Sequence, residues 1–285
     1  MNKKLIKILF LIPIIILISY SYFIEPRKLE VNKYIVKNAQ VKGIKIVFAS
    51  DFHIKPYQKK RLENIVRIIN NENPDLVLAT GDYVCGHTKH STMPIEGIAK
   101  ILGNVKTKYG FYTTLGNHDG WYGKEEITNA LEKNGIKVLS NTNVLINTDN
   151  QKFYIAGVED LMTGNPNIYK SVKGININEN LVIMLTHTPD MFPKVPKAIK
   201  LTFAGHTHGG QIRIPLIGPI FTASKYYNKN SQGWIQEVNS QVIKPDLTEP
   251  IDLKQKTLFV TRGIGLSILP FRFNCIPEIN IIEFE

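Results

Sequence analysis

The sequence predicts an α/β domain preceded by an apolar N-terminal segment. Apolar, β-branched runs alternate with polar stretches whose apolar residues have helical spacing, which is typical of βαβ units. Several of these runs end in Asp, Asn or His beside Gly, at the point where open α/β sheets build their sites. The chain has 285 residues, 43% of them hydrophobic, and shows no internal repeat or second-domain linker. We therefore expect one domain over residues 44–285.

The N-terminal segment carries no charge from Ile8 to Ile24. A helix over these residues is just long enough to cross a hydrocarbon core of about 30 Å, so residues 1–24 are expected to form a transmembrane signal anchor. A cleaved signal peptide is the alternative, but Ser19–Phe23 is a poor cleavage site. Residues 25–43 are then expected to be a tether between the anchor and the domain.

The net charge of +11 is concentrated near this segment, because residues 1–45 hold nine Lys and Arg against two Glu. Such clustering suits an anionic membrane surface rather than a nucleic-acid groove, so no nucleic-acid partner is expected. Lys3, Lys4 and Lys7 favour a cytoplasmic N-terminus, which would place the domain outside the cell membrane. The far flank is also basic, so the side of the membrane stays open.

The domain begins with a predicted strand, Ile44–Ser50, that ends in Asp51-Phe52-His53. A predicted amphipathic helix with Leu62, Ile65, Val66 and Ile69 on one face leads to a second strand over residues 75–80, which ends in Gly81-Asp82. Strand, helix and strand in this order form a βαβ unit, which places both carboxylates at the same edge of a parallel sheet.

The rest of the chain continues the pattern. A helix is expected over residues 98–105 and a strand over 109–115 that ends in Gly116-Asn117-His118-Asp119, followed by a helix over 125–133. Further strands are expected over residues 137–140, 144–147, 153–158, 181–186, 201–204, 258–261 and 279–284. Two of these end in histidine, at His187 and at the glycine-flanked His206-Thr207-His208.

Five of the seven histidines thus lie at or just after strand ends: His53, His118, His187, His206 and His208. Imidazole is the commonest neutral metal ligand, although each motif alone also fits an ordinary turn or a surface strand. Together they indicate a metal site. His87 and His90 lie in a loop and are expected to be solvent-exposed. Cys85 and Cys275 lie in no C-x-x-C motif, which excludes a zinc ribbon.

These motifs, in this order, resemble those of the calcineurin-like metallophosphoesterase superfamily. The N-terminal segment and Gly205–Gln211 look most like its membrane-associated bacterial branch, which includes enzymes similar to the UDP-diacylglucosamine pyrophosphatase of lipid A synthesis. The resemblance implies a two-sheet β-sandwich flanked by helices, and a site with two metal ions. It assigns one ion to Asp51, His53, Asp82 and His208, and the other to Asp82, Asn117, His187 and His206, with Asp82 bridging.

The ligand types agree with this assignment. Carboxylate, amide and imidazole ligands suit Mn²⁺, which we expect, and also Fe, Zn²⁺ or Mg²⁺. Two cations about 3.5 to 4 Å apart can hold a bridging hydroxide that attacks phosphorus. The resemblance also places His118 beside the substrate as a general acid. Family members with G-D-x-x-D-R have an Asp where this chain has Cys85, which argues against protein Ser/Thr phosphatase activity and leaves open what orients His118. Asp119 is one candidate.

Three downstream features are candidate substrate contacts. The apolar stretch 212–221 could line a groove for an acyl chain, or simply cap the sheet. Arg213 and Arg262 are candidate phosphate clamps, or else structural surface arginines.

The expected function is metal-dependent hydrolysis of a phosphoester or pyrophosphate bond in a phosphorylated small-molecule, lipid-linked or nucleotide-linked substrate. Hydrolysis of UDP-2,3-diacylglucosamine specifically and a non-catalytic binding module on the same fold are the alternatives.

Overall fold

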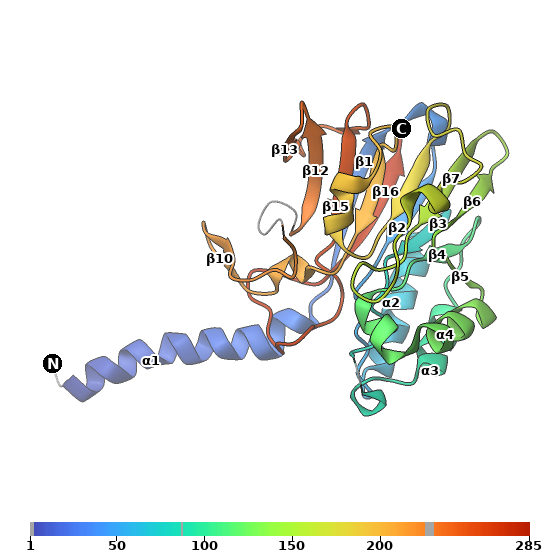
Figure 1. Ribbon diagram of the computed structural model, residues 1–285. Coiled ribbons are helices and arrows are strands. Elements are labelled where there is room, and N and C mark those ends of the chain that lie inside the picture. The colour runs from blue at the N-terminus through green and yellow to red at the C-terminus, as the bar shows by residue number, and fades with distance from the viewer. Residues whose placement is uncertain (1–2, 87, 226–230) are drawn as a thin grey trace.

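Two β-sheets pack face to face to form the body of the molecule, seen in a computed structural model that describes residues 3–86, 88–225 and 231–285 (Figure 1). The first sheet has the order β14 (Ile251–Asp252), β1 (Glu30–Lys37), β16 (Glu278–Phe284), β2 (Lys45–Phe48), β3 (Leu76–Ala79), β4 (Phe111–Thr113) and β5 (Ile136–Val138). The second has the order β13 (Gln241–Ile243), β12 (Gly233–Val238), β15 (Lys256–Val260), β9 (Leu201–Ala204), β8 (Val182–Leu185), β7 (Lys152–Gly157) and β6 (Thr142–Asn147). The predicted two-sheet α/β sandwich is confirmed; His87 lies outside the described residues.

The core between the sheets is rich in aromatic side chains. Phe48 from β2 packs against Phe203 from β9, with ring centroids 4.7 Å apart, and both side chains are fully buried. Alternate residues of the same strands, such as Val47, face the opposite side of the first sheet. Because both faces of the central strands are covered, these strands appear in the sequence as continuous apolar runs.

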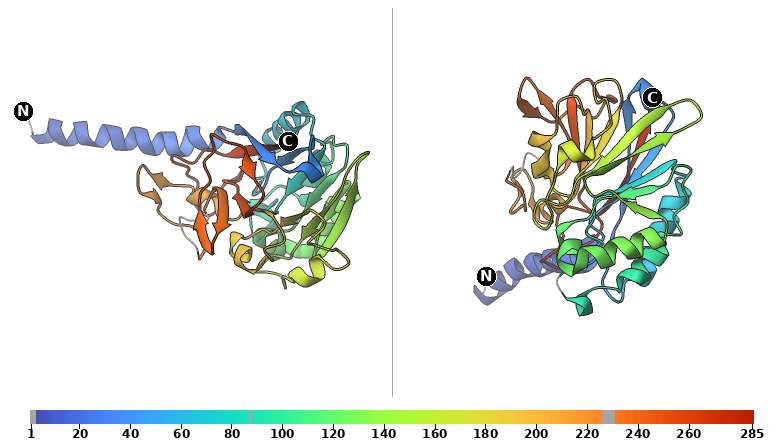
Figure 2. Two further views of the ribbon diagram at one scale, coloured as in Figure 1. Left: turned by 90° about the horizontal axis from the view of Figure 1, so that it is seen from above. Right: turned by 45° about the vertical axis from the view of Figure 1, so that its right-hand side comes forward.

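Helices cover the outer faces. The helices α2 (Lys59–Asn71), α3 (Ile95–Leu102) and α4 (Asn117–Lys133) pack on the first sheet (Figure 2). The short helix α5 (Ile168–Ser171) and the 3₁₀ helix η5 (Pro189–Lys194) pack on the second. In α2 the apolar face predicted from the sequence, Leu62, Ile65, Val66 and Ile69, is the buried face.

Strand direction determines where the site forms. Strands β2, β3, β4 and β5 are parallel, and so are β7, β8, β9 and β15. The carboxyl ends within each sheet therefore lie at one edge, as the sequence predicted for β2 and β3.

The stretch expected to be a tether differs from that expectation. Within residues 25–43, β1 pairs in parallel with β16 from Glu30 to Val36, between that strand and β14. One face of β1 is exposed, so polar residues alternate along it and no apolar run marks the strand in the sequence. Glu25 and Pro26, just before it, are also buried.

The N-terminal helix α1 (Lys3–Ser19) projects from the body and continues into a π-helical turn, η1 (Tyr20–Ile24), and a 3₁₀ turn, η2 (Glu25–Arg27) (Figures 1 and 2). Regular α-helical hydrogen bonding ends at Ser19, so α1 has 17 residues. Among the described residues, no helix combines the length and the apolar character needed to cross a membrane, so the expected transmembrane helix is not supported.

Candidate metal centre

The seven predicted ligands meet where the two sheets adjoin. Asp51 and His53 follow β2, Asp82 follows β3, and Asn117 is the first residue of α4, after β4. His187 follows β8, whereas His206 and His208 follow β9. All seven side chains are buried, with exposed fractions of at most 9%. Residues up to 157 positions apart in the sequence thus line one centre, because parallel strands deliver their ends to a common edge.

Five of these residues have left-handed backbone conformations: Asp51, His53, Asp82, His206 and His208 have φ of 54°, 42°, 55°, 70° and 50°. Such conformations cost roughly 1–3 kcal/mol each in residues other than Gly and persist where the surrounding structure imposes them. Their concentration in one cluster indicates that side-chain placement here takes precedence over backbone stability.

Two glycines allow the loops to approach the carboxylates. A Cβ atom on Gly205 would collide with Oδ2 of Asp51, and one on Gly116 would collide with Oδ1 of Asp82. Glycine in both motifs is therefore required by close packing against the carboxylates.

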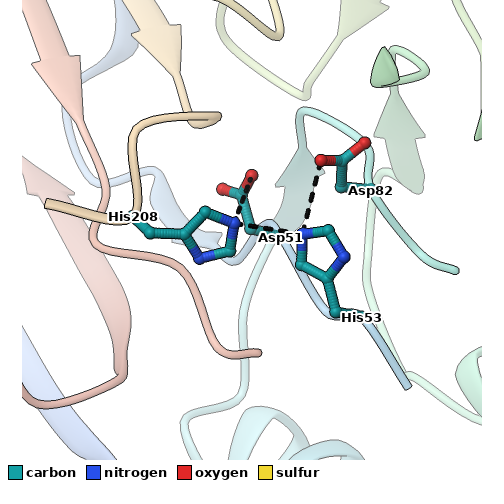
Figure 3. A group of neighbouring side chains, drawn as sticks. All are labelled: Asp51, His53, Asp82 and His208. Atoms are coloured by element: carbon teal, nitrogen blue, oxygen red, sulfur yellow. Dashed lines mark hydrogen bonds and ion pairs between the residues drawn. The ribbon is translucent and has the colours of Figure 1, made fainter. Parts of the chain in front are cut away.

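The first group comprises Asp51, His53, Asp82 and His208, each of which offers one ligand atom within 4.8 Å of the others (Figure 3). The Nε2 atoms of His53 and His208 lie 3.0 Å apart. Oδ2 of Asp82 lies 3.4 Å from Nε2 of His53, and Oδ1 of Asp51 lies 3.8 Å from Nε2 of His208. This group could hold one cation.

The second group comprises Asp82, His187 and His206. Oδ2 of Asp82 lies 3.4 Å from Nε2 of His187, which is 3.1 Å from Nδ1 of His206. Oδ1 of Asn117 lies 2.9 Å from both of these ring nitrogens. The same oxygen of Asp82 therefore faces both groups, and its other oxygen accepts a hydrogen bond from the backbone N–H of His118 at 2.9 Å.

The donor set fits two cations. Nδ1–H of His187 donates to the Thr80 carbonyl at 2.6 Å, and Nε2–H of His206 donates to the Ala223 carbonyl at 3.0 Å. The remaining ring nitrogens, Nε2 of His187 and Nδ1 of His206, are then unprotonated and face Asn117 and each other. A metal ligand requires such a free lone pair. Oδ2 of Asp51 is buried and has no hydrogen-bond partner among the residues that the structure describes. A desolvated carboxylate oxygen in this position is stabilised by a cation.

The pKa of Asp51 is shifted in a direction that a bound cation would reverse. Burial raises the pKa of Asp51 to about 6, and the neighbouring charge of Asp82 adds to this rise. Burial lowers the pKa of His118 to about 4, against the opposing effect of Asp82. Burial opposes the charge of Asp82 as well, but the imidazoles of His187 and His53 hold its pKa well below the usual range. The negative charge kept in this buried site favours a divalent cation.

The structure shows what orients His118. Its Nδ1–H donates to the backbone carbonyl of Cys85 at 2.9 Å, which leaves Nε2 directed toward Ser267, 3.5 Å from the hydroxyl oxygen. The residue that replaces the expected Asp thus orients the ring through its main chain.

Asp119, the candidate considered for orienting His118, bonds to the backbone of two loops. Its carboxylate accepts backbone hydrogen bonds from Asp82, Tyr83 and Gly116 at 2.7 to 3.0 Å, so it joins the loop after β3 to the loop after β4. Burial raises its pKa to about 7, and the charge of Asp82 contributes.

Both candidate arginines make contacts within the protein. Arg262 forms ion pairs with Glu30 and Glu278 at 2.8 and 2.6 Å, and Arg213 donates to the Gly209 carbonyl at 2.7 Å. These contacts join loop and strand segments, so both residues have a structural role, and a contact with phosphate stays a prediction.

Sequence reasoning missed Arg272. Its side chain is fully buried and donates to the carbonyls of Arg262, Gly265 and Cys275 at 2.7 to 3.0 Å. One guanidinium nitrogen also lies 3.4 Å from Nδ1 of His208. An arginine inside the apolar run Ile268–Phe273 was the available signal.

Comparison with known proteins agrees with this geometry. The family model described as calcineurin-like phosphoesterase matches residues 44–210. An uncharacterized metallophosphoesterase of Aquifex aeolicus is 32% identical, covering 95% of this chain and 97% of its own. The uncharacterized metallophosphoesterase YkuE of Bacillus subtilis is 29% identical, and the match covers 94% of this chain and 89% of YkuE. Phosphodiesterase YaeI of Escherichia coli is 26% identical, and the match covers 93% of this chain and 92% of YaeI. The chain belongs to the calcineurin-like phosphoesterase family and is a metal-dependent phosphoesterase.

Proposed function

We propose that the chain hydrolyses phosphodiesters at a centre of two divalent cations, with Mn²⁺ the expected metal. Asp51, His53, Asp82 and His208 would hold one ion, and Asp82, Asn117, His187 and His206 the other. The observation that carries the proposal is that one oxygen of Asp82 lies 3.4 Å from Nε2 of both His53 and His187, between the two groups.

When bound there, the cations supply an activated water and neutralise charge on the phosphoryl oxygens. The protein's own contribution is to fix the ligands before substrate arrives. Burial of the centre keeps the carboxylates and rings in one arrangement, and carbonyls at Thr80 and Ala223 select the histidine tautomers.

His118 acts on the leaving group. Its ring lies edge-on to His53, with centroids 4.6 Å apart, so it borders the first group, and the Cys85 carbonyl holds its Nδ1–H. Its other nitrogen can donate a proton to the leaving oxygen or stabilise charge on it. Bound anionic substrate raises the proton affinity of a neighbouring imidazole, which favours this role.

Several observations support a diester substrate. A relative that matches along nearly the whole chain is named a phosphodiesterase, and the residue expected in protein Ser/Thr phosphatases is replaced by Cys85. A lipid-linked or nucleotide-linked diester or pyrophosphate is included in this proposal, with UDP-2,3-diacylglucosamine as its most specific form. The location at the cell membrane stays a prediction.

The test is a parallel assay of the full chain with Mn²⁺ against a phosphomonoester, a phosphodiester and a UDP-linked lipid pyrophosphate. We expect metal-dependent cleavage of the diester, and no cleavage by the Asp82→Ala variant. Cleavage of the monoester alone would refute the diester assignment, and equal turnover by Asp82→Ala would refute the site.

A further inference from the structure

A cavity of about 370 Å³ opens directly against the candidate metal centre. His206 and His208, one from each group, form part of its lining, and Ser267 connects it to His118. Its volume lies within the range of about 300 to 1,000 Å³ that is usual for small-molecule sites. A group attached to a phosphoryl centre held by these residues could therefore extend into it.

The walls of this cavity are predominantly apolar. Ile212, Ile220 and Phe221 come from the segment around the hairpin of β10 (Arg213–Ile214) and β11 (Gly218–Pro219), and Ile268 and Leu269 come from the opposite loop. Phe221 is 63% exposed and Ile268 is 90% exposed. Exposed apolar side chains gathered in one place indicate a binding surface, because burying them stabilises a complex by about 25 cal/mol per Å².

The two walls are joined rigidly to the histidine loop. Gln211 accepts a hydrogen bond from the backbone N–H of Ser267 at 2.7 Å and donates to the carbonyl of Ser267 at 2.9 Å and that of Leu269 at 3.2 Å. The backbone N–H of Ile220 donates to the carbonyl of Ile212 at 3.1 Å. The cavity is therefore formed before any ligand binds.

Ile268 adds an independent observation. Its φ is 60°, a left-handed conformation that is strongly disfavoured for a β-branched residue. Backbone strain of this kind persists mainly at functional sites. At 90% exposure this side chain buries little surface within the fold, and a ligand at the rim would supply the apolar contact that it lacks.

We propose that this cavity binds a hydrocarbon chain of the substrate, so that the enzyme acts on phosphoesters that carry an alkyl or acyl group. The inference rests on the proposed function and adds the substrate class. The amide of Gln211 is already bonded at both ends, so the polar side chains of the lining left to bond a nucleobase, besides the histidines, are the hydroxyls of Thr207, Thr222 and Ser267. Five large apolar side chains line the same cavity and favour a hydrocarbon chain instead. The continuity of apolar walls with metal ligands favours a chain attached to the phosphoryl group itself.

Binding of non-hydrolysable alkylphosphonates tests the inference without relying on turnover. Methyl-, butyl- and octylphosphonate, all kept monomeric, are titrated by calorimetry into the full chain loaded with Mn²⁺. Each buried methylene contributes about 0.8 kcal/mol, so Kd should fall about fourfold per carbon until the cavity is filled. An equal Kd for all three compounds would overturn the inference, and measurable hydrolysis of a diester in parallel would leave the proposed function intact.

Two variants test whether the hydrocarbon chain of the ligand lies in this cavity. Phe221→Asp and Ile268→Asp should reduce the ratio of the methyl to the octyl Kd at least tenfold, because each places a charge in the apolar wall. Ile243→Asp, at an isoleucine of β13 that is 43% exposed, is the matched control and should keep the wild-type ratio. The apolar surface of α1 is unchanged in all three variants.

If affinity still rose with alkyl length in both wall variants, as it does in the wild type, the assignment to this cavity would be overturned. Binding to phosphatidylcholine vesicles without binding of the monomeric alkylphosphonates would assign the apolar walls to membrane contact. That result would also overturn the proposed binding of a substrate chain.

Discussion

Arg272 offers the most demanding test of how the fold supports the centre. The variant Arg272→Met keeps an unbranched apolar stem but removes the guanidinium donors to three carbonyls, those of Arg262, Gly265 and Cys275. Each carbonyl left without a donor costs about 1–3 kcal/mol, so the free energy of unfolding should fall by at least about 3 kcal/mol. Urea unfolding in the presence of a chelator measures this loss separately from any stabilisation by metal.

The same variant should also weaken the metal centre. A guanidinium nitrogen lies 3.4 Å from Nδ1 of His208, and loss of a group that positions a ligand typically lowers metal affinity 10- to 100-fold. The control is Arg61→Met, because Arg61 also donates to backbone carbonyls, those of Pro26 and Ile264, and none of its hydrogen bonds among the described residues reaches a ligand side chain. The control should lose stability yet keep its Mn²⁺ affinity in calorimetry. Equal Mn²⁺ affinity in Arg272→Met and wild type would refute the positioning role.

Four further variants test the loops around the ligands. His118→Ala should keep both metals but lose about 10²- to 10⁴-fold in kcat, measured on a diester; loss of metal would make His118 a ligand instead. Cys85→Ala should leave kcat unchanged, because the backbone carbonyl orients His118. Gly86→Ala should lower it, since the φ of Gly86 is 142° and a Cβ there would lie 3.1 Å from Nδ1 of His118; the reverse order of effects would contradict this account. Gly205→Ala should displace the carboxylate of Asp51 and weaken Mn²⁺ binding, and an unchanged Kd would argue against that contact.

The sequence predicted the strands that carry the ligands because those strands are buried on both faces. The apolar runs around β2, β3, β8 and β9 are followed at once by the polar ligands, so both the strand and its functional end are visible in the sequence. The apolar face of α2 is visible for the same reason.

Other features were hidden because their partners are distant or belong to the backbone. Strand β1 has one exposed face and pairs with β16 across almost the whole chain, so its alternating pattern resembled a polar tether. The group that orients His118 is a main-chain carbonyl, which side-chain identity at Cys85 cannot reveal. Arg262 has the charge that a phosphate clamp needs, but it forms ion pairs with Glu30 and Glu278. Glu30 lies in β1, the strand that the sequence pattern did not reveal.

Asp82 is proposed to bridge two ions, and the number of Mn²⁺ ions bound per protein chain tests this role most directly. Equilibrium dialysis of the wild-type chain and of Asp82→Ala, followed by elemental analysis, gives this number. We predict two ions per wild-type chain and, in the variant, loss of tight binding at both positions, since the shared oxygen faces both groups. A single ion in the wild-type chain, or two ions retained with equal affinity in Asp82→Ala, would contradict it.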